Sequence, residues 1–468
     1  METERDSRQV ERVFGAEIGF SIHAELNGNS ITSTSLNDDT NLPASAEIVN
    51  VWSNWRNDVL SDQGITDSNA YGFMSNGARF YFDQNRTPEY CTPEAASPEQ
   101  LVKYELSSEK FIMGMLRRLR EAGVIDKYYA NKRTTDQLGN SWGYHENIFS
   151  RARIDKSDEN TIALMGSFNA TRAVYAGTGG IMSANGEFGY VVSPRLSVTK
   201  ELVSSSRTGM KKPLICNDNS NGEFGMYRVH QVCGDASLSP WTIRMQHATN
   251  SLLMKAIESR KDFSDLFLEN PLMAASLVAG DLSLRSTLRL DSGKSIGATE
   301  WQSAFAEKFI EYFEPEGLSE DEIWALEQIK EVTDDLELST DLATDRVEWV
   351  ARLDCIRELS LRDPETQPIN EKMRDIDYTW DSLDNRGIAI RRRNNGWGWH
   401  GFDSQYEDWE INYALQNPPA NTRACFRADI IRSGEGKEVH NWGVLSNDRR
   451  IHPLAFSGGT KSKLKDNQ

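Results

Sequence analysis

Cysteine is scarce in this sequence, and its spacing offers neither a metal site nor a disulfide framework. The five cysteines are odd in number, lie far apart in 468 residues and form no CxxC pair. They are Cys91, Cys216, Cys233, Cys355 and Cys425. This usage disfavours a disulfide-stabilised secreted fold and a structural zinc site, and it fits reduced thiols in a cytoplasm.

Long hydrophobic runs and an excess of positive charge are missing as well. No apolar run approaches the roughly 20 residues that span a bilayer, and the first residues, Met-Glu-Thr-Glu-Arg-Asp, lack the layout of a secretory signal. The 70 acidic residues outnumber the 52 basic ones, for a formal net charge of -18. Because such a surface repels phosphate backbones and anionic lipids, we expect a cytoplasmic protein that binds neither nucleic acid nor membranes.

What is present is a globular balance of 38% hydrophobic and 26% charged residues. Strand-like and helix-like apolar patterns occur in the same chain, which predicts an α+β fold with an antiparallel-rich sheet and segregated helices. We expect strands at 12–22, at 78–83 and repeatedly within 184–235, a loop at 27–43, and helices at 44–60, from a capping Ser97 to near 123, at 240–259 and after a capping Ser319.

A compositional break at 391–401 predicts a domain boundary. This segment combines arginines, asparagines, glycines and tryptophans. We therefore expect a main domain of residues 1–395 and a small C-terminal domain of residues 396–468.

The most informative stretch runs from Asn76 to Thr92. A period of two places Arg79, Tyr81 and Asp83 on one strand face and apolar residues on the other. A guanidinium, a phenol and a carboxylate in a row suit an anionic substrate, and Glu89 follows after a turn. An ordinary half-solvated strand with a surface ion pair is the alternative.

A second carboxylate, Glu17, lies in an apolar strand between Gly15 and Gly19. An unpaired carboxylate is costly to bury, so Glu17 either faces solvent or coordinates a cation. Carboxylates in a chain with only seven histidines suit Mg²⁺ better than Zn²⁺.

Two histidines stand in polar, strand-like segments. His145 follows a turn in Gly139–Asn147, and the spacing of Arg228 and His230 places both on one face of a strand. Both readings, structural histidines and metal ligands, stay open at this point.

Taken together, these segments resemble the Pup ligase and depupylase family of glutamine-synthetase-like carboxylate-amine ligases. Its motifs G-I-E-T-E-[YF]-G, N-G-A-R-[LF]-Y-x-D, P-E-Y-x-[TA], G-N-S-Y-G-x-H-E-N-Y, Y-R-R-L-H-V-x-x-G-D and P-P-x-x-T-R-A-x-[FL]-R are echoed in order. Here they begin at residues 15, 76, 88, 139, 227 and 418. The resemblance therefore covers nearly the whole chain.

The resemblance implies a glutamine-synthetase-like catalytic domain that holds ATP and Mg²⁺ and is closed by the small C-terminal domain. Such ligases phosphorylate the γ-carboxylate of the C-terminal glutamate of Pup, and a lysine of a target protein then forms the isopeptide bond. By position, Asp83 would be the catalytic base. The candidate ATP ligands are Arg79, Thr92, Trp442 and Arg228, and the candidate metal ligands are Glu17, Tyr81, Glu89, His145 and His230.

Departures from the motifs leave alternatives open. Gly19 stands where the family has a second glutamate, which bears on the number of metal ions. A depupylase would hydrolyse the same bond, but the interval before Asn76 is short, as in the ligases. A divergent paralogue acting on another peptide, or one that binds ATP without turnover, is the remaining alternative.

Overall fold

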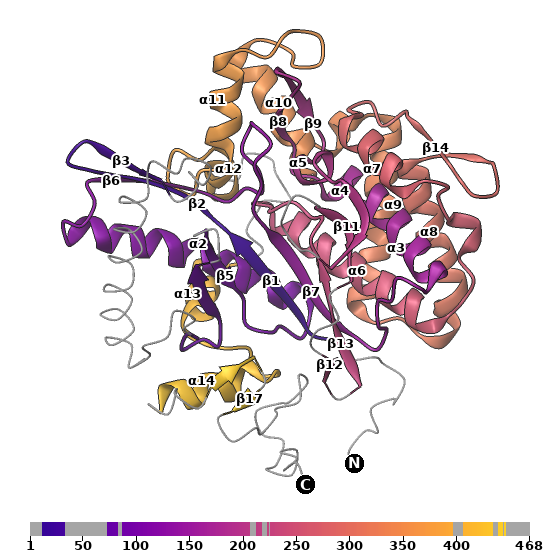
Figure 1. Ribbon diagram of the computed structural model, residues 1–468, viewed down its shortest axis with the longest axis horizontal. Coiled ribbons are helices and arrows are strands. Elements are labelled where there is room, and N and C mark those ends of the chain that lie inside the picture. Colours follow the sequence, from indigo (N-terminus) through magenta and orange to yellow (C-terminus); the bar gives the residue numbers. More distant parts are fainter. Residues whose placement is uncertain are drawn as a thin grey trace.

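The centre of the molecule is a six-stranded antiparallel sheet (Figure 1). The computed structural model describes residues 12–32, 73–82, 87–205, 212–217, 222–223, 225–395, 406–433, 439–442 and 444–445. The strand order is β12-β13-β7-β1-β5-β4. The strands are β12 (Gly222–Glu223), β13 (Met226–Gln231), β7 (Tyr144–Ser150), β1 (Phe14–Gly19), β5 (Pro88–Cys91) and β4 (Arg79–Phe82).

The expected strand at 12–22 is interrupted at Phe20, so β1 is followed by β2 (Ser21–Leu26) in a second sheet. There β2 pairs with β6 (Lys127–Asn131) and with β3 (Asn29–Thr32). The predicted loop at 27–43 was therefore wrong over residues 29–32, which form the strand β3. Asn27 and Gly28 have φ values of 53° and 78°, and an Asn-Gly pair with positive φ is the preferred two-residue hairpin turn.

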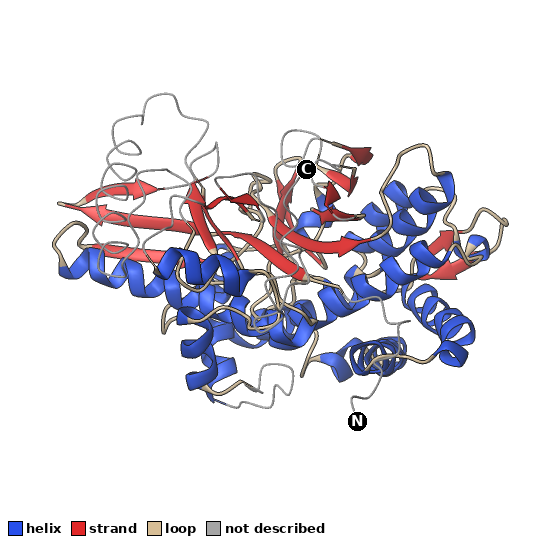
Figure 2. Ribbon diagram, turned by 90° about the horizontal axis from the view of Figure 1, so that it is seen from below, coloured by secondary structure: helices blue, strands red, loops and turns tan. Residues whose placement is uncertain are grey.

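Helices gather on one side of the central sheet (Figure 2). The helices α2 (Pro98–Glu121) and α6 (Pro240–Ser259) pack on the apolar face of the sheet, with α3 (Glu159–Thr171) beside α6. Their inward residues and the strand residues Phe14, Ile18 and Tyr90 share one continuous hydrophobic core. The opposite face of the sheet is left for the polar side chains.

Several predicted helix starts are confirmed. The Ser97 hydroxyl accepts a hydrogen bond from Gln100 N at 3.0 Å, and α2 ends at Glu121. The helix predicted at 240–259 is α6. Ser319 and Glu322 form a capping box at the start of α9 (Glu320–Leu338). The helix expected at 44–60 lies outside the described residues.

The strands expected within 184–235 are confirmed, and helices that were not expected lie among and after them. Strands β10 and β11 are parallel, and the other short strands pair as antiparallel hairpins. These elements are α4 (Ala173–Ala176), β8 (Gly180–Ala184), β9 (Glu187–Val191), α5 (Pro194–Ser197), β10 (Glu201–Ser204), β11 (Pro213–Cys216), α7 (Pro271–Gly280), β14 (Thr287–Arg289), β15 (Ser295–Gly297), α8 (Ala298–Phe313), α10 (Glu348–Ser360) and α11 (Glu371–Trp380).

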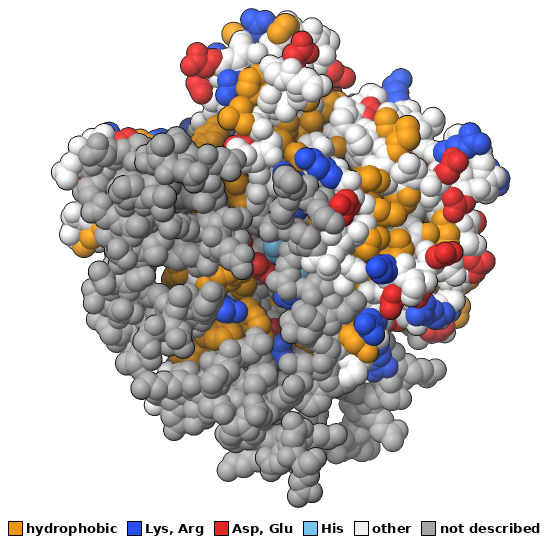
Figure 3. Space-filling model, viewed as in Figure 1, with side chains coloured by type: hydrophobic (Ala, Val, Ile, Leu, Met, Phe, Trp, Pro, Cys, Tyr) orange, Lys and Arg blue, Asp and Glu red, His pale blue; other side chains and the backbone are white. Residues whose placement is uncertain are grey.

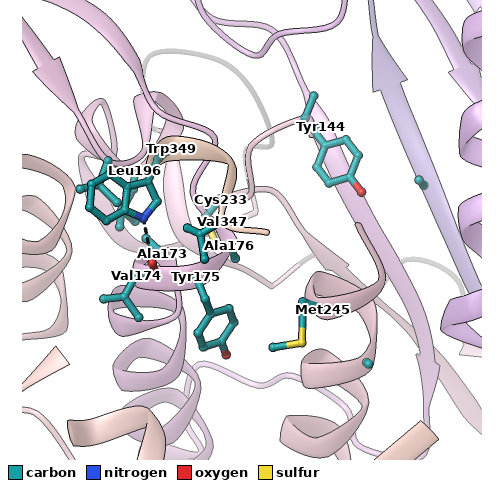
Figure 4. Packing of buried hydrophobic residues seen from close by; sticks show 14 of the residues in the cluster. Tyr144, Ala173, Val174, Tyr175, Ala176, Leu196, Cys233, Met245, Val347 and Trp349 are labelled. Carbon is teal, nitrogen blue, oxygen red and sulfur yellow. Dashed lines mark hydrogen bonds between the residues drawn. The ribbon is translucent and has the colours of Figure 1, made fainter. Parts of the chain in front are cut away.

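Trp349 of α10 is one of the anchors of this helical region (Figure 4). Its ring is fully buried, and its Nε1 donates to Val174 O at 2.8 Å.

Among the described residues, no helix combines the length and the apolar character that crossing a membrane requires.

The C-terminal part packs against the main body. Its elements are α12 (Ile388–Asn395), α13 (Asp408–Gln416), α14 (Ala424–Arg432), β16 (Val439–Asn441) and β17 (Val444–Leu445). Helix α13 lies along α2, and Asn76 Nδ2 donates to Ala414 O at 3.1 Å. The predicted division at 395/396 falls at the end of α12, and it stays a prediction.

Candidate active site

One face of the central sheet carries nearly all the predicted site residues. In antiparallel strands, directly paired residues point to the same face. Glu17 pairs with Cys91 and His145, and His230 pairs with Asn147 two residues further along β7. By the same register this face, called the site face below, bears Gly15, Glu17, Gly19, Arg79, Tyr81, Glu89, Cys91, His145, Asn147, Arg228 and His230.

Glu17 is the centre of the site face. The Tyr81 hydroxyl donates to Glu17 Oε1 at 2.7 Å. His145 Nδ1 lies 3.5 Å from Oε1, and His230 Nε2 lies 3.9 Å from Oε2. The two imidazole rings meet edge to face, with centroids 4.7 Å apart. Carboxylate and imidazole atoms therefore converge within 4.8 Å of one another from three neighbouring strands.

The charges around Glu17 keep it ionised. Burial raises the pKa of Glu17, but His145, His230 and the Tyr81 hydrogen bond more than offset this, so its pKa lies well below the ordinary value. Burial, together with Cys91, Glu17 and Glu89, raises the pKa of Tyr81 far above its ordinary value. The Tyr81 phenol therefore stays protonated and donates to a carboxylate.

His145 is buried without the hydrogen bonds that a structural histidine usually makes. Its side chain is only 3% exposed, and neither ring nitrogen makes a hydrogen bond within the described part of the chain. Buried polar groups in folded proteins nearly always have a partner. Glu17 is the charged side chain that lies beside this imidazole, 3.5 Å from Nδ1.

An open pocket extends from Glu17 along the site face. It encloses about 680 Å³ of empty space, including the part that opens to solvent. Thr92, Arg228 and Trp442 line it, as the resemblance implies for ATP-binding residues. The other lining residues are Val13, Phe14, Gly15, Ala16, Glu17, Cys91, Glu94, Asn147, Phe149 and Arg423.

The C-terminal helix α14 is held at this pocket by Glu94. Arg423 Nε donates to Glu94 Oε1 at 2.7 Å, and Arg427 Nη2 donates to Oε2 at 2.5 Å. Burial raises the pKa of Glu94, but the two guanidinium groups outweigh it and lower the pKa to about 2. Arg427 also donates to Trp442 O at 2.6 Å, which secures the backbone of Trp442 at the pocket.

Thr92 and Arg79 are positioned by their neighbours. The Thr92 hydroxyl accepts from Ala16 N at 3.0 Å, and Thr92 N donates to Ala16 O at 2.9 Å. Arg79 lies over the Tyr81 ring, 5.1 Å from its centroid. Glu89 is buried opposite Tyr81 and Gly19.

The structure thus brings together the predicted residues Glu17, Tyr81, His145 and His230, and it places Thr92, Arg228 and Trp442 around the adjoining pocket. Asp83 lies outside the described residues. The sequence reasoning missed three residues at the pocket, Glu94, Arg423 and Asn147. Only Arg423 and Asn147 stood inside quoted motifs, and no local pattern showed that Glu94 would pair with residues more than 300 positions away.

Figure 3 shows histidine and acidic side chains in a hollow near the centre of the view. The atoms that converge at Glu17 fit a divalent cation, since one carboxylate, two imidazoles and a phenol are ligands or ligand partners that such ions use.

Comparison with known proteins agrees with this reading. The family model described as Pup-ligase protein matches residues 12–445. The chain belongs to the Pup-ligase family. It is 30% identical to the Pup--protein ligase of Acidimicrobium ferrooxidans, over 79% of this chain and 80% of that protein. It is 28% identical to the one of Kineococcus radiotolerans, over 78% and 81%.

Two solved structures share the fold. A crystal structure of the complex between Pup and its ligase PafA superposes with a TM-score of 0.76 at 20% identity, covering 92% of this chain and 86% of that one. PafA in complex with ADP superposes with a TM-score of 0.69 at 21% identity, covering 83% and 86%. The expected α+β fold is confirmed.

Proposed function

We propose that this chain is an ATP-dependent ligase that joins the C-terminal glutamate of Pup, or of a Pup-like protein, to a lysine of a target protein. Its membership of the Pup-ligase family supports this assignment. Relatives named Pup--protein ligase favour ligation over the hydrolysis performed by a depupylase.

The observation that carries the proposal is the placement of an open pocket directly beside the Glu17 cluster on one sheet face. A ligase of this kind needs a nucleotide and a carboxylate donor within bonding distance of each other. Glu17 belongs both to the lining of the pocket and to the cluster.

The chemistry assigns tasks to residues of this chain. A carboxylate is a poor electrophile, so it must be phosphorylated, and the charge on the transferred phosphoryl group must be neutralised. Glu17 and Glu89, assisted by Tyr81, would hold Mg²⁺, which supplies that neutralisation. Arg79, Arg228 and Thr92 would bind the nucleotide phosphates.

The remaining tasks fall to Trp442 and Asp83. Trp442, placed at the pocket by Arg427, would contact the adenine ring. A lysine amine has a pKa of about 10.4 and is protonated at neutral pH, so a carboxylate base must remove its proton during attack. We assign that role to Asp83, on the strength of its motif position. The five cysteines are free and buried, which suits a reaction in the cytoplasm.

The test is mass spectrometry of the protein with ATP, Mg²⁺, a Pup-type peptide ending in glutamate and a lysine-bearing acceptor. We expect an isopeptide adduct that needs ATP, is lost in Asp83→Asn and persists in the matched control Asp334→Asn, an exposed residue of α9. Cleavage of a preformed conjugate without any ligation would instead assign a depupylase. Silence in both directions would overturn the proposal.

A further inference from the structure

We propose that Trp142 binds the peptide donor of the ligase, with its indole N–H donating to the γ-carboxylate of the donor's C-terminal glutamate. This inference rests on the proposed function, because it names a further substrate-binding residue for the same reaction. Trp142 belongs to the loop between β6 and β7, and its ring lies against Gly19 at the end of β1.

The backbone of this loop places the indole over Gly19. Trp142 N donates to Thr134 O at 3.0 Å, and Gly19 N donates to Gly143 O at 2.9 Å. A Cβ at Gly19 would lie 3.0 Å from Trp142 Cδ1, so the ring occupies the space that a side chain of residue 19 would fill on the site face. Because Cδ1 is bonded to Nε1, the indole N–H lies at this same end of the site face.

The indole N–H of Trp142 differs from four others in the chain. Trp142 Nε1 is buried and makes no hydrogen bond within the described residues. The indole nitrogens of Trp241, Trp301, Trp349 and Trp380 each donate to an oxygen at 2.7–2.9 Å. A buried donor without a partner is unfavourable, and an acceptor that arrives with a substrate would complete the hydrogen bonding of Trp142.

The position of Trp142 relative to the pocket indicates which substrate it meets. Among the residues of β1, the pocket is lined by Glu17 and by the residues that precede it, Phe14 to Ala16. Gly19 lies on the other side of Glu17, about 6.8 Å further along the strand. The pocket and the indole N–H therefore flank the Glu17 cluster from opposite sides.

Phosphoryl transfer to a carboxylate requires two substrates on opposite sides of the transferred group. The attacking oxygen and the leaving oxygen lie roughly in line with the phosphorus between them. The carboxylate oxygen forms the new bond to phosphorus, while the bond from phosphorus to the leaving oxygen of ADP breaks and its electron pair stays with ADP. With the nucleotide in the pocket, the donor carboxylate approaches from the side of Gly19 and meets the indole N–H.

A neutral donor also suits a carboxylate that must react. The N–H orients the carboxylate without transferring a proton to it, and it does not neutralise the charge that the oxygen uses to attack. A lysine or arginine at this point would reduce that charge. Glu89 lies directly opposite Gly19, and the Mg²⁺ that we assign to Glu89 would offset its repulsion of the incoming carboxylate.

The test compares the wild type with Trp142→Phe, which keeps an aromatic ring and removes the N–H. Two labelled Pup-type peptides are used, one ending in glutamate and one ending in norvaline, which carries a methyl group in place of the γ-carboxylate. Fluorescence anisotropy with Mg²⁺ and without ATP gives the peptide Kd. We expect Trp142→Phe to bind the glutamate peptide about 10- to 100-fold more weakly and the norvaline peptide as the wild type does.

The ligation assay should show the same selectivity, with a raised KM for the glutamate peptide and an unchanged KM for ATP. Trp241→Phe is the matched control, because Trp241 Nε1 donates to Gln328 Oε1 on α9, away from the site face. Circular dichroism shows whether each variant is folded. If Trp142→Phe unfolds, Gly19→Ala replaces it, since its methyl would displace the indole and should cause the same selective loss.

Equal weakening of both peptides would overturn the proposal, because the lost interaction would not involve the γ-carboxylate. Unchanged peptide affinity in a folded variant, or a loss confined to ATP, would overturn it as well. Normal ligation and an unchanged peptide KM in Trp142→Phe would overturn only this inference. Peptide binding that depends on Trp142 and the γ-carboxylate, without any ligation by the wild type, would overturn only the proposed function.

Discussion

Tyr144 and His145 are neighbours on β7, but their side chains stand on opposite faces of the central sheet. On the helix side, the Tyr144 hydroxyl donates to Glu105 Oε2 at 3.0 Å. On the site face, His145 has no hydrogen bond to either ring nitrogen within the described chain. The same strand thus presents polar groups with hydrogen-bond partners to the core, and polar groups without such partners in the described chain to the pocket.

The next two residues of β7 repeat the contrast. Glu146 faces the helices and accepts from Arg172 Nη1 at 2.9 Å and Nη2 at 2.5 Å, with Asn250 as a further donor. Asn147 faces the site, and its Oδ1 has no hydrogen-bond partner in the described residues. Buried polar groups with complete partners hold a fold together, and those without them are available to a ligand. The helix side therefore serves stability and the site face serves binding.

The strongest way to test this division is Arg172→Leu. The substitution leaves Glu146 buried without its counter-ion, which costs about 3–5 kcal/mol of unfolding free energy. Urea unfolding measures the loss, and the exposed Arg285→Leu is the control. Adding Glu146→Leu should restore part of the stability, because no lone charge then remains. A loss below about 1 kcal/mol would show that the pair is dispensable.

Acid should release the C-terminal helix through Glu94. Its pKa is lowered from 4.5 to about 2 in the folded protein, so its stabilising contribution is complete above pH 4.5 and is lost as the pH falls from about 4.5 to about 2. The shift corresponds to about 3 kcal/mol. Unfolding measured across this range should therefore converge for the wild type and Glu94→Gln at low pH and diverge at neutral pH.

The control for this pH series is Glu337→Gln, an exposed residue of α9. Its unfolding curve should run parallel to that of the wild type. A constant difference between wild type and Glu94→Gln at every pH would contradict the assigned role of the Arg423 and Arg427 pairing.

Strand alternation and composition were sufficient to predict part of this site. The period of two in 78–83 placed Arg79 and Tyr81 on one face, and the lone Glu17 in an apolar strand was expected either to face solvent or to coordinate a cation. Both predictions depend only on the order of residues within one strand. The convergence of His145 and His230 on Glu17 depends on the register of β7 with β1 and β13, which residue patterns do not contain.

The same limit applies to the pairs that lie far apart in the sequence. Glu94 with Arg427, and Glu146 with Arg172, join elements whose proximity depends on the whole fold. The hairpin of β2 and β3 was a different kind of miss, because Asn27-Gly28 is a local turn signal that could have been read from the sequence.

Gly143→Ala addresses the site face alone. The added methyl would overlap the His145 ring, so we expect Mg²⁺-dependent nucleotide binding to be about 10- to 100-fold weaker. Gly189→Ala is the matched control, since nothing lies within 4 Å of its Cβ position. Equal nucleotide affinity in the two variants, with Mg²⁺ present, would mean that the ring moves aside without cost. Near-wild-type unfolding in Gly143→Ala would show that this face contributes binding rather than stability.

Trp442→Ala is expected to have the smallest effect. Trp442 packs edge to face on Phe73 with centroids 5.1 Å apart and lines the pocket. Loss of one aromatic contact is worth about 1 kcal/mol, a roughly fivefold rise in the nucleotide Kd by fluorescence titration. The exposed Trp409→Ala on α13 is the control. If Trp442→Ala lowers the free energy of unfolding but leaves the nucleotide Kd unchanged, Trp442 stabilises the fold and does not bind the nucleotide. The residues of the site face and the C-terminal residues that line the pocket would then differ in function.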